Sequence, residues 1–107
     1  MNEDILSVRL DEDWHRYVLD FEGEVAGVAH FLPHGEHVVF THTVVDERFE
    51  GQGFGSVLVR NALDDVRARG KRIVPVCPFV RAYLSKHHEW DDLVDQPTPR
   101  LKEEMAD

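Results

Sequence analysis

Three glycines at alternate positions, Gly51, Gly53 and Gly55, constrain the fold of this chain more than any other feature. The run before them, 44–50, starts with two valines and becomes charged, and the run after them has helical periodicity. Glycine lets the backbone turn sharply and approach a ligand closely. The first N–H groups of a helix have no partner within the helix and carry its positive dipole end. The pattern predicts an anion site suited to phosphate; the alternative is a tight turn with a helix cap.

Two better-known glycine motifs do not fit this run. A P-loop needs a lysine followed by serine or threonine, and no lysine stands between Gly51 and Ser56. A dinucleotide-binding fingerprint would place its third glycine at Ser56, and the strand that follows begins with Lys71 and Arg72 instead of supplying an acidic ribose partner. Both nucleotide motifs are therefore excluded.

Three strand-like segments precede the glycine turn. Residues 14–21, 25–32 and 37–45 are apolar or alternating, and short turns containing Gly23 and Gly35 separate them. They predict an antiparallel meander. Residues 5–10 add either a short strand or an irregular lead-in.

The period changes after the turn. Residues 54–69 carry an apolar stripe at helical spacing that Gly70 ends, residues 73–76 form a short buried strand, and Pro78 opens a second helix over 79–87. The order predicts an α/β fold in which a meander is followed by a helix, a strand parallel to the third one, and a second helix. Because proline cannot donate to a sheet, Pro75 predicts that the parallel strands part there and leave a wedge with free backbone groups. An extended, amide-bearing ligand would fill that wedge.

Length and composition set bounds on the class of protein. The 107 residues predict one domain, with a lead-in over 1–13 and an acidic tail over 95–107. A single cysteine excludes an internal disulfide, and no apolar run approaches the ~20 residues of a membrane helix. A soluble, cytoplasmic protein is expected, without membrane association.

The net charge of −9 is unevenly distributed. Residues 1–50 hold three basic against twelve acidic side chains, whereas residues 60–86 hold seven basic and two acidic ones. The later segment suits a small polyanion; the alternative is a solvated helix face with pairs such as Asp65 and Arg69. So acidic a chain is not expected to bind nucleic acid.

Several stretches together resemble the small, truncated, single-domain subfamily of GNAT N-acetyltransferases over residues 14–94. They are His42-Thr43, the run 51–56, Ala62-Leu63-Asp64, the run 75–80, Tyr83-Leu84, His87 and the run 89–93. The resemblance implies acetyl-CoA as cofactor, with its pyrophosphate on the N–H groups of residues 51–56 and its pantetheine on the two strand edges. The cofactor-binding residues so implied are Val44, Val45, Gly51, Gln52, Gly53, Phe54, Gly55, Ser56, Val76 and Cys77.

The chain departs from the GNAT pattern at two positions. The pattern begins with Gln or Arg, where this chain has Glu50; a carboxylate there would repel a pyrophosphate, and we expect it to point outward. Many relatives have a glutamate after the His-Thr pair, where this chain has Val44, so a glutamate base is excluded at that position. The subfamily also lacks the N-terminal helices that form the acceptor pocket of larger GNATs, which leaves the acceptor undefined.

Three residues are candidates for the chemistry. Histidine is the residue type best suited to proton transfer near neutral pH, and His42 stands close to the expected wedge, where it is either a general base or a half-buried strand histidine. Cys77 precedes a helix and is an acetyl acceptor, a lining of the thioester site or a small buried residue. Tyr83 would present a phenol to the leaving thiolate, or pack in the core.

These observations predict an acyltransferase that moves an acetyl group from acetyl-CoA to an unidentified amine by direct attack. The alternative is a CoA-binding or acetyl-CoA-binding sensor or interaction module without turnover. The seven histidines lack zinc-finger spacing, so no metal is expected. A monomer or weak homodimer is expected.

Overall fold

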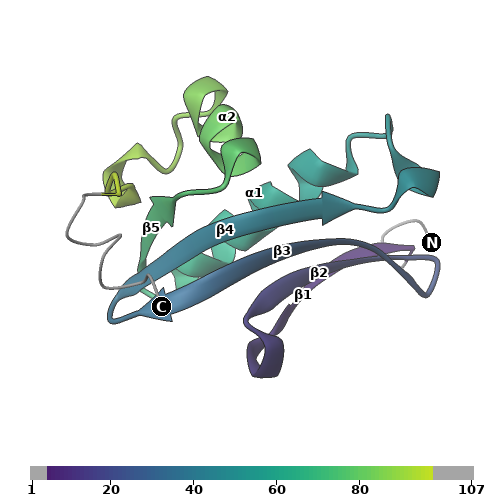
Figure 1. Cartoon of the computed structure of the whole chain (residues 1–107), viewed down its shortest axis with the longest axis horizontal. Coiled ribbons are helices and arrows are strands. Elements are labelled where there is room, and N and C mark those ends of the chain that lie inside the picture. Colours follow the sequence, from purple (N-terminus) through teal and green to yellow (C-terminus); the bar gives the residue numbers. More distant parts are fainter. Residues whose placement is uncertain (1–4, 98–107) are drawn as a thin grey trace.

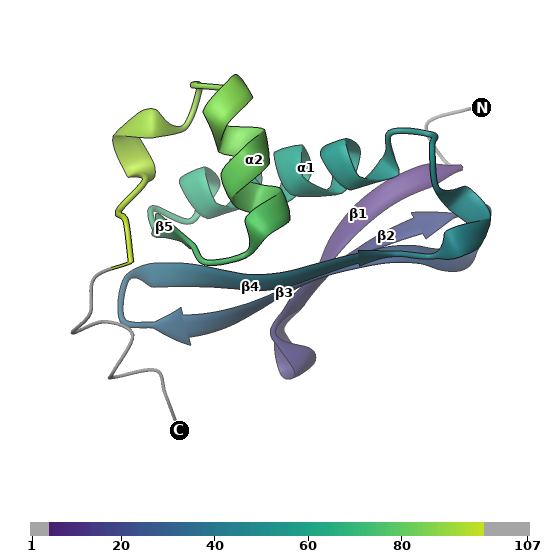
Figure 2. The same cartoon turned by 45° about the horizontal axis from the view of Figure 1, so that its top comes forward.

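A single five-stranded sheet with two helices on one of its faces forms the domain (Figure 1). The structure is a computed structural model, and it describes residues 5–97. Figure 2 shows α1 and α2 on the same side of the sheet, and the hydrophobic core lies between them and the strands. The strands and helices are β1 (Leu6–Asp11), β2 (Arg16–Phe21), β3 (Glu24–His34), β4 (His37–Val45), α1 (Phe54–Ala68), β5 (Arg72–Pro75) and α2 (Pro78–Lys86).

The first four strands form the expected antiparallel meander, in the order β1-β2-β3-β4. Of the two alternatives for residues 5–10, the strand is correct, since β1 pairs with β2 along its whole length. The prediction that the next strand starts at Trp14 was wrong. Trp14 ends a short 3-10 turn, Glu12–Trp14, and His15 has a left-handed φ of 51° that reverses the chain, so β2 begins at Arg16.

Helix α1 packs its apolar stripe across the sheet. Its buried residues recur at helical spacing and face the meander. The helix ends one residue before the expected limit of 69, and Gly70 follows with φ 71° and donates its N–H to the carbonyl of Arg67. A glycine in this conformation satisfies a free carbonyl at the helix end and turns the chain toward β5.

Strands β4 and β5 are parallel and then part, as the proline predicted. Pairing runs from His37 with Arg72 to Phe40 with Pro75. The N–H groups of Val76 and Cys77 then both donate to the carbonyl of Phe40, at 3.0 and 2.8 Å. Beyond that point β4 continues over residues 41–45 with no β5 partner in the described chain, so its edge is open.

The chain beyond α2 returns over α1 and β5. The indole of Trp90 donates to Asp64 at 3.0 Å, a 3-10 turn follows at Asp91–Leu93, and the N–H of Asp95 donates to the carbonyl of Ile73 at 2.8 Å. The segment after α2 therefore contacts the domain as far as Asp95, and residues 98–107 of the expected tail lie outside the described residues. Neither helix within residues 5–97 is both long and apolar enough to cross a membrane.

Candidate functional site

A cavity of about 400 Å³ lies where the open edge of β4 meets the glycine turn and the first turns of both helices. Strand β4 leads through a short 3-10 turn, Glu47–Phe49, into the glycines and then α1, while α2 approaches from the other side. The lining residues are Thr43, Val45, Phe49, Glu50, Gly51, Gly53, Phe54, Gly55, Ser56 and Phe79.

Backbone conformation explains the first two glycines of the turn. Gly51 has φ 86° and Gly53 has φ 77°, in the left-handed region that other residues rarely adopt. An added Cβ at either position would meet no atom within 4 Å, so the requirement is conformational and not steric. Gly53 precedes the first residue of α1 and offers no side-chain cap, which leaves the first N–H groups of the helix available to an anion.

Close packing explains the third glycine. A Cβ on Gly55 would lie 2.6 Å from Cζ of Phe79, because the phenyl ring covers this position. Phe79 is 41% exposed and lines the cavity from α2. The contact between Gly55 and Phe79 thus joins the N-terminal ends of the two helices beside the cavity.

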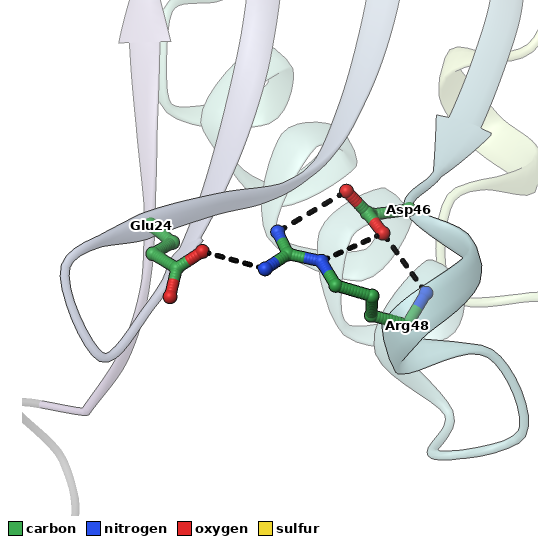
Figure 3. Close-up of polar contacts among 3 residues, drawn as sticks. All are labelled: Glu24, Asp46 and Arg48. Carbon is green, nitrogen blue, oxygen red and sulfur yellow. Dashed lines mark hydrogen bonds and ion pairs between the residues drawn. The ribbon is translucent and has the colours of Figure 1, made fainter.

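A cluster of three charged residues holds the segment that leads into the turn (Figure 3). Asp46 accepts from the backbone N–H of Arg48 at 2.9 Å and also from its guanidinium, which reaches Glu24 on β3 at 2.8 Å. Hydrogen bonds from Arg48 lower the pKa of Asp46, and the two carboxylates raise the pKa of Arg48. The guanidinium also covers the ring of Phe49, 4.8 Å from its centroid. The cluster fixes the path of the chain from β4 toward the glycines.

Cys77 lies behind the cavity wall. It is 2% exposed, directly precedes α2, and its sulfur is 3.3 Å from the hydroxyl of Thr43. Thr43 lines the cavity and Cys77 does not, so the thiol is one side chain removed from the cavity surface. The expected position just past the strand end and before a helix is confirmed.

His42 lies on the opposite face of the sheet from Thr43, because neighbouring residues of a strand alternate. It is exposed, and its ring stacks on that of His30 with centroids 6.0 Å apart. Burial lowers the pKa of His30, and the nearby His42 and Arg16 lower it further. No helix within the described residues covers this face (Figure 2).

Tyr83 packs in the core beneath α2. Its ring stacks on His87 at 4.1 Å and contacts Trp90 at 5.9 Å between centroids. Burial raises the pKa of its phenol, and the residue does not line the cavity.

The structure brings most of the predicted cofactor-binding residues together. The cavity gathers Val45, Gly51, Gly53, Phe54, Gly55 and Ser56. Val44 is exposed on the helix-free face, and Gln52, Val76 and Cys77 lie outside the lining. Glu50 is exposed, but it also lines the cavity, which places it at the mouth.

Four lining residues were not among the predicted cofactor-binding ones: Thr43, Phe49, Glu50 and Phe79. Alternation along β4 could have indicated Thr43, since it lies two residues from Val45 on the same face. Phe79, directly after the proline that opens α2, could have been found as an apolar residue off the helix stripe. The sequence pattern did not predict that Phe49 lines the cavity, because its orientation depends on the 3-10 turn.

Three of the seven basic residues of the segment 60–86 are paired with carboxylates. Arg67, Arg69 and Arg72 bind Asp92, Asp65 and Asp95, respectively. For these three arginines the alternative of a paired, solvated surface is correct. The described residues contain no group of three or more acidic, histidine or cysteine side chains arranged to hold a metal ion.

Comparisons with known proteins bear on the family and the fold of the chain. The family described as GCN5-related N-acetyl-transferase matches residues 16–93. The fold is similar to that of a GCN5-like protein from Staphylococcus aureus, with a TM-score of 0.65 and 20% identity over 89% of this chain and 93% of that one. It is also similar to the ribosomal-protein-S18-alanine N-acetyltransferase from Escherichia coli, with a TM-score of 0.53 and 22% identity over 59% of this chain and 41% of that one. No functionally curated protein matches the chain.

Proposed function

The chain belongs to the GCN5-related N-acetyltransferase family, and from this premise we propose that it transfers an acetyl group from acetyl-CoA to an amine. The observation that carries the proposal is the cavity itself. It combines a glycine turn at a helix N-terminus with the open edge of a strand that has parted from its parallel neighbour. The glycine turn suits a pyrophosphate, and the open strand edge suits the amides of an extended pantetheine.

The residues present fit this cofactor. The N–H groups at the start of α1, over residues 53–56, would hold the pyrophosphate, since the left-handed glycines leave them uncapped. The edge of β4 near Thr43 and Val45 would hold the pantetheine, with Phe79 packed against it from α2. Val76 and Cys77 would support the cavity from behind its wall, where β5 diverges from β4.

When bound, acetyl-CoA would supply an acetyl thioester: the acceptor nitrogen would bond to the acetyl carbon as the C–S bond breaks, and CoA would leave as the thiolate with the electron pair of that bond. His42 would accept the proton that the incoming ammonium must lose, from the face that no helix of the described chain covers. Thr43 would line the acetyl end of the cavity, with the thiol of Cys77 directly behind it. Tyr83, which packs in the core, would act through the position of α2.

A second candidate function is binding of CoA or acetyl-CoA without turnover. Val44 favours this function, because it stands where many relatives have a glutamate. The side chain of Val44 is also exposed on the helix-free face of the sheet.

Release of free thiol from acetyl-CoA separates the two functions. We expect the rate to rise above the solvent background when one class among polyamines, lysine peptides and small primary amines is added. Binding of acetyl-CoA with a rate at background for every amine class would favour the module without turnover.

A further inference from the structure

A second cavity, of about 340 Å³, lies at the other end of α1. It is enclosed by the start of β2, the turn between β3 and β4, and the segment that follows α1. None of its lining residues also lines the glycine-turn cavity. The 15 residues of α1 separate the two, which is about 22 Å at 1.5 Å per residue. This second cavity is therefore not part of the proposed acetyl-CoA site.

The floor of the second cavity is apolar and aromatic. Tyr17 and Phe31 are buried with ring centroids 5.4 Å apart, and Val38 lies beside them. The hydroxyl of Tyr17 donates to Asp65 at 2.7 Å, so its polar end is engaged outside the cavity. A floor of this kind suits a flat apolar group.

The rim carries one cation without a partner. Arg69 lines the cavity, but its guanidinium binds Asp65 at 2.7 Å and Glu12 at 3.1 Å, so its single positive charge is already offset by two carboxylates. Lys71 is half-buried on the same rim, and its ammonium has no carboxylate partner within residues 5–97. An ammonium without a carboxylate partner beside an apolar floor favours an anionic ligand.

We propose that this second cavity binds a small aromatic carboxylate, with its ring over Tyr17 and Phe31 and its carboxylate at Lys71. A single negative charge fits better than a phosphate, because Glu12 stands on the same rim and would repel a dianion. The volume is at the lower end of the ~300 to 1,000 Å³ usual for ligand pockets, which limits the ligand to about one ring. The inference does not depend on acetyl transfer.

The test uses phenylacetate as the probe and 2-phenylethylamine as its counterpart of opposite charge, followed by backbone amide NMR of the full chain. Phenylacetate is expected to cause saturable shifts confined to residues 10–17, 31–38 and 69–71, and the amine is not. Lys71→Met should weaken phenylacetate binding about ten-fold or more, and Lys71→Arg should keep it within about three-fold. Lys86→Met, which removes a charge from the exposed end of α2, should leave it unchanged. Saturating acetyl-CoA should not displace the probe.

Four results would overturn the proposal: equal binding of the amine, unchanged affinity in Lys71→Met, shifts centred on residues 49–56, or shifts at the second cavity that depend on protein concentration without probe. The third would place the probe in the acetyl-CoA cavity. The fourth would assign the second cavity to another copy of the chain. Because the probe is read by NMR, the result is independent of whether acetyl transfer occurs.

Discussion

At the scale of single residues, the alternation of β4 separates the two main candidates for chemistry. Thr43 faces the helices and contacts Cys77, whereas His42 faces away beside His30. Two residues adjacent in sequence therefore serve opposite faces of the parted strands. The arrangement favours a base that meets the amine on one face and a thiol that lies behind the cofactor side without reacting.

Replacement of Cys77 tests whether its thiol takes no part in the reaction. Cys77→Ala should keep acetyl-CoA affinity and most of any transfer rate, because the thiol lies behind Thr43 and outside the cavity lining. Steady-state rates and intact mass after incubation with acetyl-CoA are the measurements. A loss of turnover by orders of magnitude, with an acetyl adduct on the wild-type sulfur, would instead show a covalent relay.

Replacement of His42 tests whether it is the base that deprotonates the amine. His42→Gln should lower the maximal rate with little effect on acetyl-CoA affinity, and should remove the rise in rate with pH through the range where histidine titrates. His30→Gln is the matched control, since it stands beside His42 on the same face and should keep that rise. If the His42→Gln variant retained the rise in rate, solvent and not His42 would be the acceptor of the proton that the amine loses.

At the scale of elements, the site depends on how the N-terminal ends of α1 and α2 meet. Phe79 covers Gly55 so closely that a methyl group there would displace the ring. The ring is partly exposed and can swing away, so the consequence of such a change falls on the cavity more than on the core.

A pair of substitutions tests this contact. Gly55→Ala should weaken acetyl-CoA binding about five-fold, or ~1 kcal/mol, because the displaced ring no longer lines the cavity as before. In a Phe79→Ala background the same Gly55→Ala change should alter the affinity much less. Calorimetric titration of the four proteins measures this coupling. An equal loss in both backgrounds would place the effect on the helix backbone instead.

The sequence predicted the elements well where a local rule determines them. The meander, the glycine turn and the parting at Pro75 each follow from turn chemistry or from a missing N–H group. It failed where a boundary depends on one backbone angle, as at Trp14, which the left-handed His15 excludes from β2. Phe79 was missed as a site residue because its position against Gly55 arises from contact between two helices far apart in sequence.

At the scale of the whole molecule, the segment after α2 closes the domain through charged contacts. Asp95 accepts from Arg72 at 2.6 Å and lies 2.9 Å from a ring nitrogen of His37, so it joins β5, β4 and the end of the described chain. Hydrogen bonds from Arg72 and His37, which outweigh burial, lower the pKa of Asp95 to about 2. The carboxylate stabilises the fold only while it is ionised.

Acid should therefore remove the contribution of Asp95. Its folded-state pKa is below the ordinary value of 3.8, so the contribution is present above pH 3.8 and is lost as the pH falls through about 2. Asp95→Asn should lower the free energy of unfolding by at most about 1 kcal/mol at pH 7, since the pair is partly exposed to solvent. Denaturant titrations of wild type and variant should converge toward pH 2. The exposed Asp13→Asn serves as control, and a difference between wild type and Asp95→Asn that persists at pH 2 would contradict the linkage.

The central claim is that acetyl-CoA binds with its pyrophosphate on the glycine turn at the start of α1. Calorimetric titration with acetyl-CoA of wild type, Gly53→Val and Gly35→Val tests it most directly. Both glycines have positive φ, 77° and 62°, and neither would crowd a neighbour with a Cβ, so the two variants carry similar backbone strain. Gly35 lies in the turn between β3 and β4, away from the cavity.

With each variant shown to be folded by near-ultraviolet circular dichroism, we predict that Gly53→Val abolishes binding and Gly35→Val keeps the wild-type affinity. Wild-type affinity in a folded Gly53→Val protein would contradict the claim.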